Sequence, residues 1–217
     1  MGMAKVAEQT VDAASGTPER ILLAAEKLFS ERGVDAVSLR EITAAAGVNT
    51  AAAHYHFGSK EAVLQELFAL RAQPIADRRE ELLSQLKLDG SGRPILEDIL
   101  AAFLRPGLEA LGTPDGMAFS MMRARMAFER EEVRRAALSK AFNRTSEMAL
   151  NALMKALPDL PNKTLHWRFH FLLGSMVYTM AMPGRIESIT HDGIDTVDPE
   201  AALAQLVRFA AAGFRAP

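Results

Sequence analysis

The sequence predicts an all-α protein, in which an N-terminal three-helix domain with a helix-turn-helix is followed by a larger helical domain. Apolar residues make up 49% of the 217 positions, which is enough for a substantial core. Strand-like alternation is almost absent, and apolar residues recur mainly at helical spacing. The stretch 37–60 holds two short helical patterns separated by a Gly-Val step, and two short helices at a tight turn form a helix-turn-helix.

The first helix is expected to begin with Thr17 as its N-cap and Pro18 at its first helical position. Gly33 is expected to end it. Its buried stripe consists of Ile21, Ala25, Leu28 and Phe29. Residues 1–16 mix small and polar side chains without periodicity, so we interpret them as a flexible tail.

The two short helices carry clear start and stop signals. Ser38 followed by Glu41 is a capping box, so a helix should begin at Leu39. Gly47 can supply the left-handed residue that ends this helix, and Asn49 is a good N-cap for the next one. Small residues fill the crossing, and Val48, Ala53 and Phe57 can face inward.

The side chains left on the outside are residue types that contact DNA. The major groove admits one α-helix, whose N-terminal residues read base edges while nearby hydroxyl, imidazole and ammonium groups hold phosphates. His54 and His56 have the simpler alternative of being exposed side chains without a role. The predicted contacts are Ser38, Asn49, Thr50, Ala51, His54, Tyr55, His56 and Lys60.

Residues 17–70 resemble the TetR family of transcriptional regulators, through the strings A-A-E-K-L-F-S-E-R-G and G-V-N-T-A-A-A-H-Y-H-F-G-S-K-E-A. The resemblance implies a DNA-binding domain followed by a variable helical domain that binds a small ligand and dimerises. By position, Thr50 and Ala51 fall where the family often reads bases, and Tyr55, His56 and Lys60 where it often holds phosphates. The family commonly has a larger apolar residue and a tyrosine where this chain has Ala53 and His54, which leaves open which side chains reach the bases.

The charge balance alone would not predict DNA binding. The formal net charge is −2, and acidic residues balance basic ones within 17–60. Binding should therefore depend on a dimer and a specific site more than on bulk electrostatics. We accordingly expect a homodimer on a pseudo-palindromic double-stranded operator.

The chain divides into the tail (1–16), a helix-turn-helix domain (17–62) with a linker helix to about residue 73, and a ligand-binding and dimerisation domain (74–217). Pro74 should kink or break the linker helix near Gln73, and Pro106-Gly107 should interrupt a second helix. The further helices are expected at 95–111, 118–132, 133–157, 164–182 and 200–214.

The stretch 169–182 contains no charged residue, although it is too short to span a bilayer. A helix that is apolar all round is buried all round. We therefore expect one side to face its own core and the other a twofold partner, together with the last helix. The predicted interface residues are Leu173, Gly174, Val177, Leu206 and Ala210.

Methionine placement indicates a ligand cavity, because nine of the eleven methionines lie at or beyond residue 117. Soft, unbranched side chains suit a pocket that adapts to its ligand, although an ordinary core would show the same pattern. The predicted lining is Phe119, Met122, Arg123, Met126, Phe142, Trp167, His170, Phe171 and Tyr178. Arg105, Arg123, Arg125, Asn143 and Arg144 could all provide a polar anchor, and the sequence does not select among them.

The ligand should be small and apolar or amphipathic, and it should release a repressor from DNA. The carboxyl half loosely resembles TetR-like regulators that sense fatty-acyl compounds, through stretches such as L-H-W-R-F-H-F-L-L-G. His166 and His170 have zinc-ligand spacing but lack the glutamate of the metalloprotease helix, so we predict no metal and no cofactor.

Other classes of protein receive little support. There are no cysteines, and the nucleophile elbow, phosphate loop and dinucleotide fingerprint are missing. The alternative is an all-α small-molecule-binding protein or enzyme that does not bind DNA. With no membrane-spanning run and no leader pattern, we expect a cytoplasmic protein.

Overall fold

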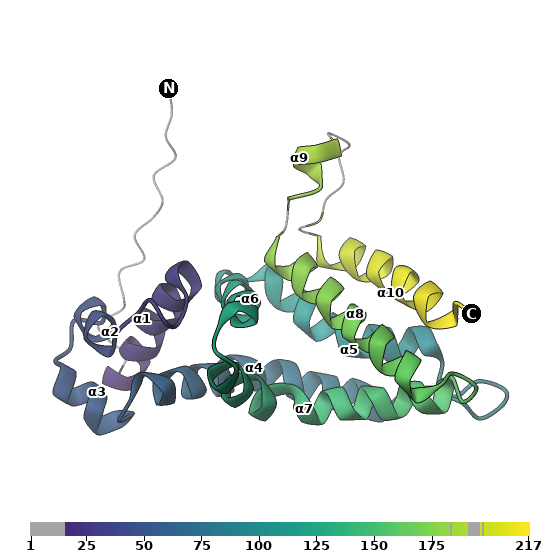
Figure 1. Cartoon of the computed structure of the whole chain (residues 1–217), viewed down its shortest axis with the longest axis horizontal. Helices are drawn as coiled ribbons and strands as arrows, with labels where there is room; N and C mark the ends of the chain where they lie inside the picture. The colour runs from purple at the N-terminus through teal and green to yellow at the C-terminus, as the bar shows by residue number, and fades with distance from the viewer. Residues whose placement is uncertain (1–15, 183, 191–195, 197) are drawn as a thin grey trace.

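The computed structural model describes residues 16–182, 184–190, 196 and 198–217, and it confirms the all-α prediction (Figure 1). These residues contain no strand, only an isolated bridge between Leu88 and Pro94. Residues 1–15, which make up nearly all of the predicted tail, lie outside the described residues. None of the described helices is long and apolar enough to cross a membrane.

The first three helices are α1 (Thr17–Arg32), α2 (Leu39–Ala45) and α3 (Thr50–His56). Thr17 is the first helical residue, so the prediction that it is the N-cap is wrong by one position. Gly16 occupies the cap and makes no side-chain hydrogen bond. Its carbonyl accepts the first helical hydrogen bond, from the Arg20 N–H, and the proline in the first turn leaves one fewer amide in need of a cap.

Helix α4 (Lys60–Ser84) runs without a break through Pro74, so the chain does not break near Gln73. Pro74 is exposed, whereas Ile75, Arg79 and Leu83 on the same helix are buried. Packing of α4 against α5 and α7 holds the helix on both sides of the proline. Helix α5 (Leu96–Glu109) likewise continues through Pro106, so the second predicted interruption is wrong.

The remaining helices are α6 (Pro114–Arg125), α7 (Glu131–Ala156), α8 (Asn162–Ala181), α9 (Glu187–Thr190) and α10 (Pro199–Arg215). The 3₁₀ turns η1 (Ala110–Gly112) and η2 (Met126–Phe128) flank α6. Figure 1 shows α1–α3 at one end of the molecule, α8 and α10 at the other, and α4 running from the first group into the second.

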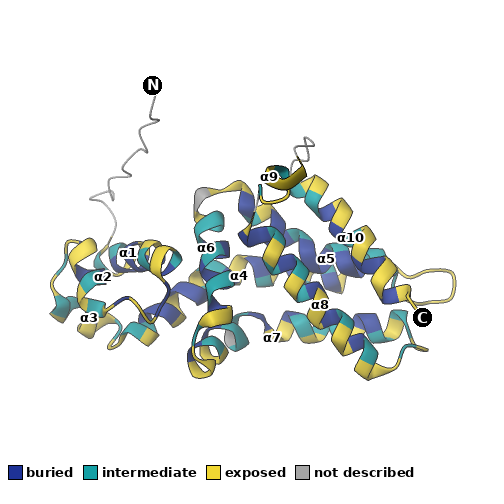
Figure 2. Cartoon of the chain, turned by 45° about the horizontal axis from the view of Figure 1, so that its top comes forward, coloured by how far each residue is buried: buried dark blue, intermediate teal, exposed yellow. Residues whose placement is uncertain are grey.

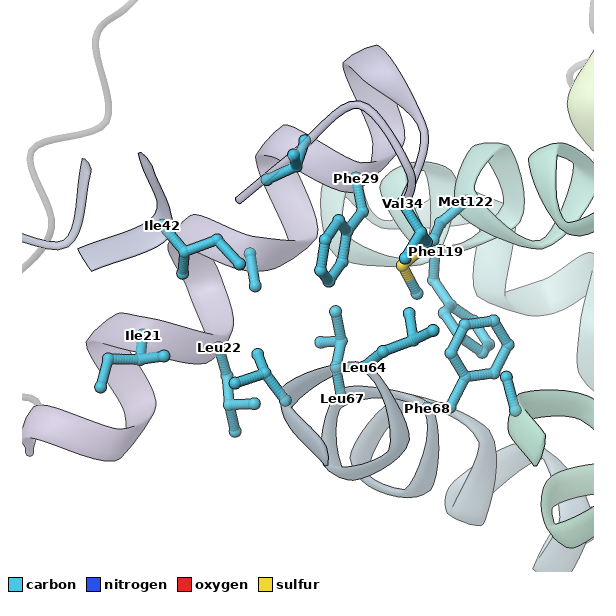
Figure 3. Close-up of a cluster of buried hydrophobic side chains, with 14 of the residues drawn as sticks. Ile21, Leu22, Phe29, Val34, Ile42, Leu64, Leu67, Phe68, Phe119 and Met122 are labelled. Atoms are coloured by element: carbon cyan, nitrogen blue, oxygen red, sulfur yellow. The ribbon is translucent and has the colours of Figure 1, made fainter. Parts of the chain in front are cut away.

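The buried side chains form two clusters along this axis. Figure 2 marks the buried residues along the helices in dark blue. One fills the centre of α1–α4 and continues into α6 and α7, where Phe119 and Met122 lie against Phe68 and Leu64 (Figure 3). The other joins α5, α7, α8 and α10. The first cluster crosses the predicted boundary at residue 73, and α1 packs directly on α6.

Candidate functional site

The helix-turn-helix is held by side chains that cap its short helices. The Ser38 hydroxyl accepts from the Glu41 N–H at 3.2 Å, and the Glu41 carboxylate accepts from the Ser38 N–H at 2.8 Å, so the predicted capping box is present. Hydrogen bonds from Ser38 and then Arg32 lower the pKa of Glu41 to about 2. Arg20 donates to the carbonyls of Ala46 and Gly47 at 2.6 and 3.2 Å, which satisfies the end of α2.

The recognition helix α3 presents the outward face that the sequence predicts. Asn49 caps it by accepting from the Ala52 N–H at 2.8 Å. Ala53 is fully buried, while Tyr55 is 86% exposed. Thr50 is half-buried and its hydroxyl lies 3.2 Å from that of Thr43 on α2. The exposed residues at this end of the molecule include Ser38, Asn49, Ala51, His54, Tyr55 and His56.

Besides Asn49 and Thr50, three of the predicted contact residues make side-chain hydrogen bonds within the chain. The Lys60 ammonium donates to the Val34 carbonyl at 2.8 Å and is half-buried. The Ser38 hydroxyl donates to Glu41 at 2.7 Å, and the His54 Nδ1 lies 2.9 Å from the Gly58 carbonyl oxygen. An ammonium carries three N–H groups, so Lys60 keeps donors for a phosphate.

The outer face of α8 and α10 is apolar and exposed. Phe171, Tyr178 and Phe209 are 61%, 58% and 69% exposed, and Gly174, on the α8 side of this face, has open space beside it. A groove runs between the two helices, lined by Arg168, Phe171, Leu172, Ser175, Phe209, Ala210, Gly213, Phe214 and Ala216.

The predicted interface residues are divided between the outer face and the core. Leu173 and Val177 are half-buried and Gly174 is exposed. Leu206 and Ala210 are each only 7% exposed in the single chain, because α10 packs on α5. Ala210 nevertheless lines the groove between α8 and α10, whereas Leu206 packs in the core of its own chain. Their place in a dimer interface stays a prediction. Phe209, which is absent from the predicted interface, is the large exposed residue of α10.

The predicted ligand-lining residues are also divided. Phe119, Met122, Arg123, Met126 and Phe142 are buried together between α6 and α7. The structure does not bring Trp167, His170, Phe171 and Tyr178 together with these five, because the four residues lie on the exposed side of α8. A helix that is apolar all round gave no signal as to which side faced inward.

Two arginines lie in the interior beside this cluster. Arg79 on α4 is 1% exposed and Arg123 on α6 is 9% exposed. Arg79 donates to the Phe103 carbonyl at 2.7 Å. Burial lowers the pKa of Arg79 to about 9, with the charge of Arg123 adding to the effect, and burial lowers the pKa of Arg123 to about 10. Arg79 is absent from the predicted sites, although its place on the apolar stripe of α4 between Ile75 and Leu83 was a usable signal.

Polar contacts join α6 and the start of α7 to the end of α1. The Arg125 Nε donates to the Ser30 carbonyl at 2.7 Å. The Glu129 carboxylate accepts from the Val34 N–H at 2.6 Å, directly after the last turn of α1. These two hydrogen bonds join the end of α6 and the turn before α7 to the segment that leads into the helix-turn-helix.

A buried ion pair connects the same helices from the other side. Arg71 on α4 binds Glu26 on α1 through both carboxylate oxygens, at 2.6 to 3.1 Å, and Asp115 on α6 at 2.9 Å. Burial raises the pKa of Glu26, although the hydrogen bonds and charge of Arg71 act to lower it. Helices α1, α4 and α6 are thus joined by one guanidinium.

Two family models match the chain. Residues 21–67 match the model described as bacterial regulatory proteins, tetR family. Residues 101–213 match the model described as tetracyclin repressor-like, C-terminal domain. The first covers most of α1, all of α2 and α3, and the start of α4, and the second covers most of the helices after α4.

A curated relative is the HTH-type transcriptional regulator AcrR of Shigella flexneri, 37% identical over 95 residues, which are 44% of this chain and 43% of that protein. The chain thus aligns with less than half the length of this relative. Among solved structures, the fatty acid degradation regulator FadR of Bacillus halodurans has a TM-score of 0.65 at 16% identity, covering 95% of this chain and 100% of that one. FadR of Bacillus subtilis in complex with stearoyl-CoA has a TM-score of 0.57 at 16% identity, covering 90% and 98%. At these identities the two structures show a shared fold.

Proposed function

Because this chain belongs to the TetR family of bacterial regulatory proteins, we propose that it is a homodimeric cytoplasmic repressor that a small ligand releases from its operator. The observation that carries this proposal is the outward face of α3, which is polar and aromatic and is held in a capped helix-turn-helix. Such a face matches the major groove in size and chemistry.

The residues of the helix-turn-helix take different roles in this proposal. Thr50 and Ala51 lie in the first turn of α3, from which base edges are read. Tyr55, His56 and Lys60 lie further along the chain and hold phosphates. Asn49 and His54 flank the base-reading turn, and Ser38 at the start of α2 approaches the backbone of the duplex.

The second copy of the chain is proposed to dock on α8 and α10. Their exposed aromatic residues form an apolar face at the end of the molecule opposite α3 (Figure 1). A twofold axis through this face leaves both α3 helices free to enter successive grooves, ~34–36 Å apart. Leu173, Gly174 and Val177 of the predicted interface belong to this proposal, together with Phe209.

Release from DNA is proposed to act through α6. This helix carries Phe119, Met122 and Arg123 of the interior cluster, and its end holds α1 through Arg125. A ligand that moves α6 would change the spacing of the two recognition helices. A coupling of ~1–3 kcal/mol would already alter operator occupancy. Because the Bacillus subtilis FadR structure is a complex with stearoyl-CoA, the shared fold supports small amphipathic ligands, including fatty-acyl compounds.

DNA binding is tested by selecting an operator from random double-stranded DNA and measuring affinity against salt concentration. We expect Lys60→Ala to weaken binding similarly on all sequences and to reduce the salt slope by ~1, as the loss of one phosphate contact does. Lys155→Ala is the matched control, because Lys155 is an exposed lysine near the end of α7. Failure to select any sequence would contradict the proposed function.

Dimerisation is tested with Gly174→Arg and sedimentation. A side chain at Gly174 meets no atom within 4 Å in the single chain, so the variant should fold yet place a large cation in the interface. We expect a monomer with greatly weakened operator binding. Gly90→Arg is the control, because Gly90 has equally open surroundings in the loop before α5. An intact Gly174→Arg dimer would move the interface elsewhere.

A further inference from the structure

Two buried guanidiniums share one aromatic ring in the interior of the larger domain. The Arg123 guanidinium carbon lies 4.5 Å from the centroid of the Phe142 ring, and that of Arg79 lies 5.6 Å from it. Arg79 also lies 4.4 Å from the Phe103 ring. Helices α4, α6 and α7 therefore bring two positive charges together in an apolar region.

The charges of this arginine pair, Arg79 and Arg123, are not balanced within the described residues. Neither guanidinium has a carboxylate within 4.0 Å there, and the Nε and Nη1 of Arg123 are buried without a hydrogen-bond partner. The hydroxyl of Ser120, one turn before Arg123 on α6, is also buried and unsatisfied. Taking an ion out of water costs far more than a cation–π contact returns.

An arginine that stays charged while buried needs an anion. The Phe103 ring and the Phe103 carbonyl stabilise the Arg79 guanidinium, but the Nε and Nη1 donors of Arg123 have no hydrogen-bond partner. Guanidinium groups bind carboxylate and phosphate oxygens with a planar fork of N–H donors. The unused donors thus fit an oxyanion supplied from outside the chain.

We propose that the arginine pair binds the oxyanion headgroup of an organic ligand whose apolar body lies among Phe119, Phe142 and the nearby methionines. This inference rests on the proposed function, since it assigns the chemical class of the ligand. The Met176 sulfur lies 3.5 Å from the Arg79 Nη2. The Met180 sulfur is also close to this guanidinium, because a Cβ built on Gly107 would lie 3.4 Å from the Arg79 Nη2 and 3.5 Å from the Met180 sulfur. Methionines can change rotamer to admit the ligand.

The position of Arg123 allows ligand binding to affect the DNA-binding end. Arg123 lies in the last turn of α6, and Arg125 in the same turn holds the Ser30 carbonyl at the end of α1. An anion that draws Arg123 and Arg79 together pulls on α6 at this point. The ligand thereby favours one placement of α6, which the contacts of Arg125 and Glu129 pass to α1.

The experiment compares anions with neutral compounds of the same body in thermal-shift and calorimetric titrations of the full chain. The probes are octanoate, octyl phosphate and benzoate, paired with octanamide, octanol and benzamide. At about a hundred times its dissociation constant, an anion that binds should raise the melting temperature by roughly 5 °C or more. Comparing octanoate with octyl phosphate distinguishes a carboxylate from a phosphate headgroup.

Variants connect this binding to the arginine pair. Arg123→Met should weaken binding of the effective anion by at least about tenfold, because a charge-assisted hydrogen bond is lost. Arg79→Met should act in the same direction, and if it does not fold, Arg123→Met alone decides. Arg93→Met is the control, because Arg93 is exposed in the loop between α4 and α5. It should bind the anion as the unaltered chain does.

The proposal is overturned if no anion stabilises the chain more than its neutral counterpart, or if Arg123→Met binds the anion unchanged. Both measurements are made without DNA. A chain that fails them but still binds its selected operator as a dimer would lose the anion site and keep the proposed function. A chain that binds the anion but selects no operator would keep the anion site and lose the proposed function.

Discussion

Helix α4 places one arginine in each of two regions, a half-buried Arg71 and a buried Arg79, and the two regions differ in how the positive charge is balanced. At the joint between α1, α4 and α6, Arg71 is held by two carboxylates, Glu26 and Asp115. Further along α4, Arg79 lies with Arg123 among aromatic rings, and neither has a carboxylate within 4.0 Å in the described residues. The first arrangement is complete without a ligand. The second leaves the Nε and Nη1 donors of Arg123 without a partner, and we propose that an external anion completes it.

Among the variants that test this contrast, Arg71→Met should have the largest effect on stability. It leaves the Glu26 carboxylate buried without its cation, and breaking a buried pair in this way costs about 3–5 kcal/mol. We expect that loss of unfolding free energy in denaturant titrations at pH 8. Arg78→Met is the control on the same helix, because Arg78 forms an exposed ion pair with Glu81 and exposed pairs contribute little.

The loss of unfolding free energy in Arg71→Met should depend on pH in a defined direction. Burial raises the pKa of Glu26, and Arg71 no longer opposes this in the variant. A carboxyl with a raised pKa in the folded state costs stability above its unfolded pKa, so the deficit should shrink as the pH falls toward 5. A deficit that stays constant between pH 8 and 5 would mean that Glu26 finds another cation.

The second test is Arg123→Met, for which we expect the opposite sign. Removing a buried charge that lacks a counter-ion should leave the ligand-free protein unchanged or raise its unfolding free energy, by up to about 4 kcal/mol. Denaturant titration without added anions measures this. A loss comparable to that of Arg71→Met would show that Arg123 is balanced within the chain, and the contrast between the two regions would fail.

The smallest expected effect is at the surface, where Arg32 and Glu41 form an exposed pair beside the capping box. The pKa of Glu41 is lowered from 4.5 to about 2. Its contribution to stability is therefore present above about pH 4.5 and lost as the pH falls toward 2. Ser38→Ala should move the Glu41 pKa back toward 4.5, which an NMR titration of its carboxyl group would detect. An unmoved pKa would assign the shift to the Ser38 N–H and to Arg32, which the variant keeps.

Local signals predicted the DNA-binding end well. The capping box of Ser38 and Glu41, the cap at Asn49 and the turn at Gly47 involve residues within a few positions of one another. Hydrogen bonds between residues this close in the sequence form within one short segment. The residue spacing is therefore enough to predict them. The exposed face of α3 follows from the same periodicity.

Tertiary packing decided the features that involve helices far apart in the sequence. Helix α4 continues through Pro74 because α5 and α7 pack along it. Leu206 is buried because α10 lies on α5. Trp167, Phe171 and Tyr178 of α8 lie outside the buried cluster that contains Phe119 and Phe142, because an all-round apolar helix has no periodicity to orient it. The sequence determined the all-α fold and the capped helix-turn-helix, whose hydrogen bonds are local. The placement of Arg79 beside Arg123 was decided only when α4, α6 and α7 came together, since the energy of a buried charge depends on neighbours that no single segment contains.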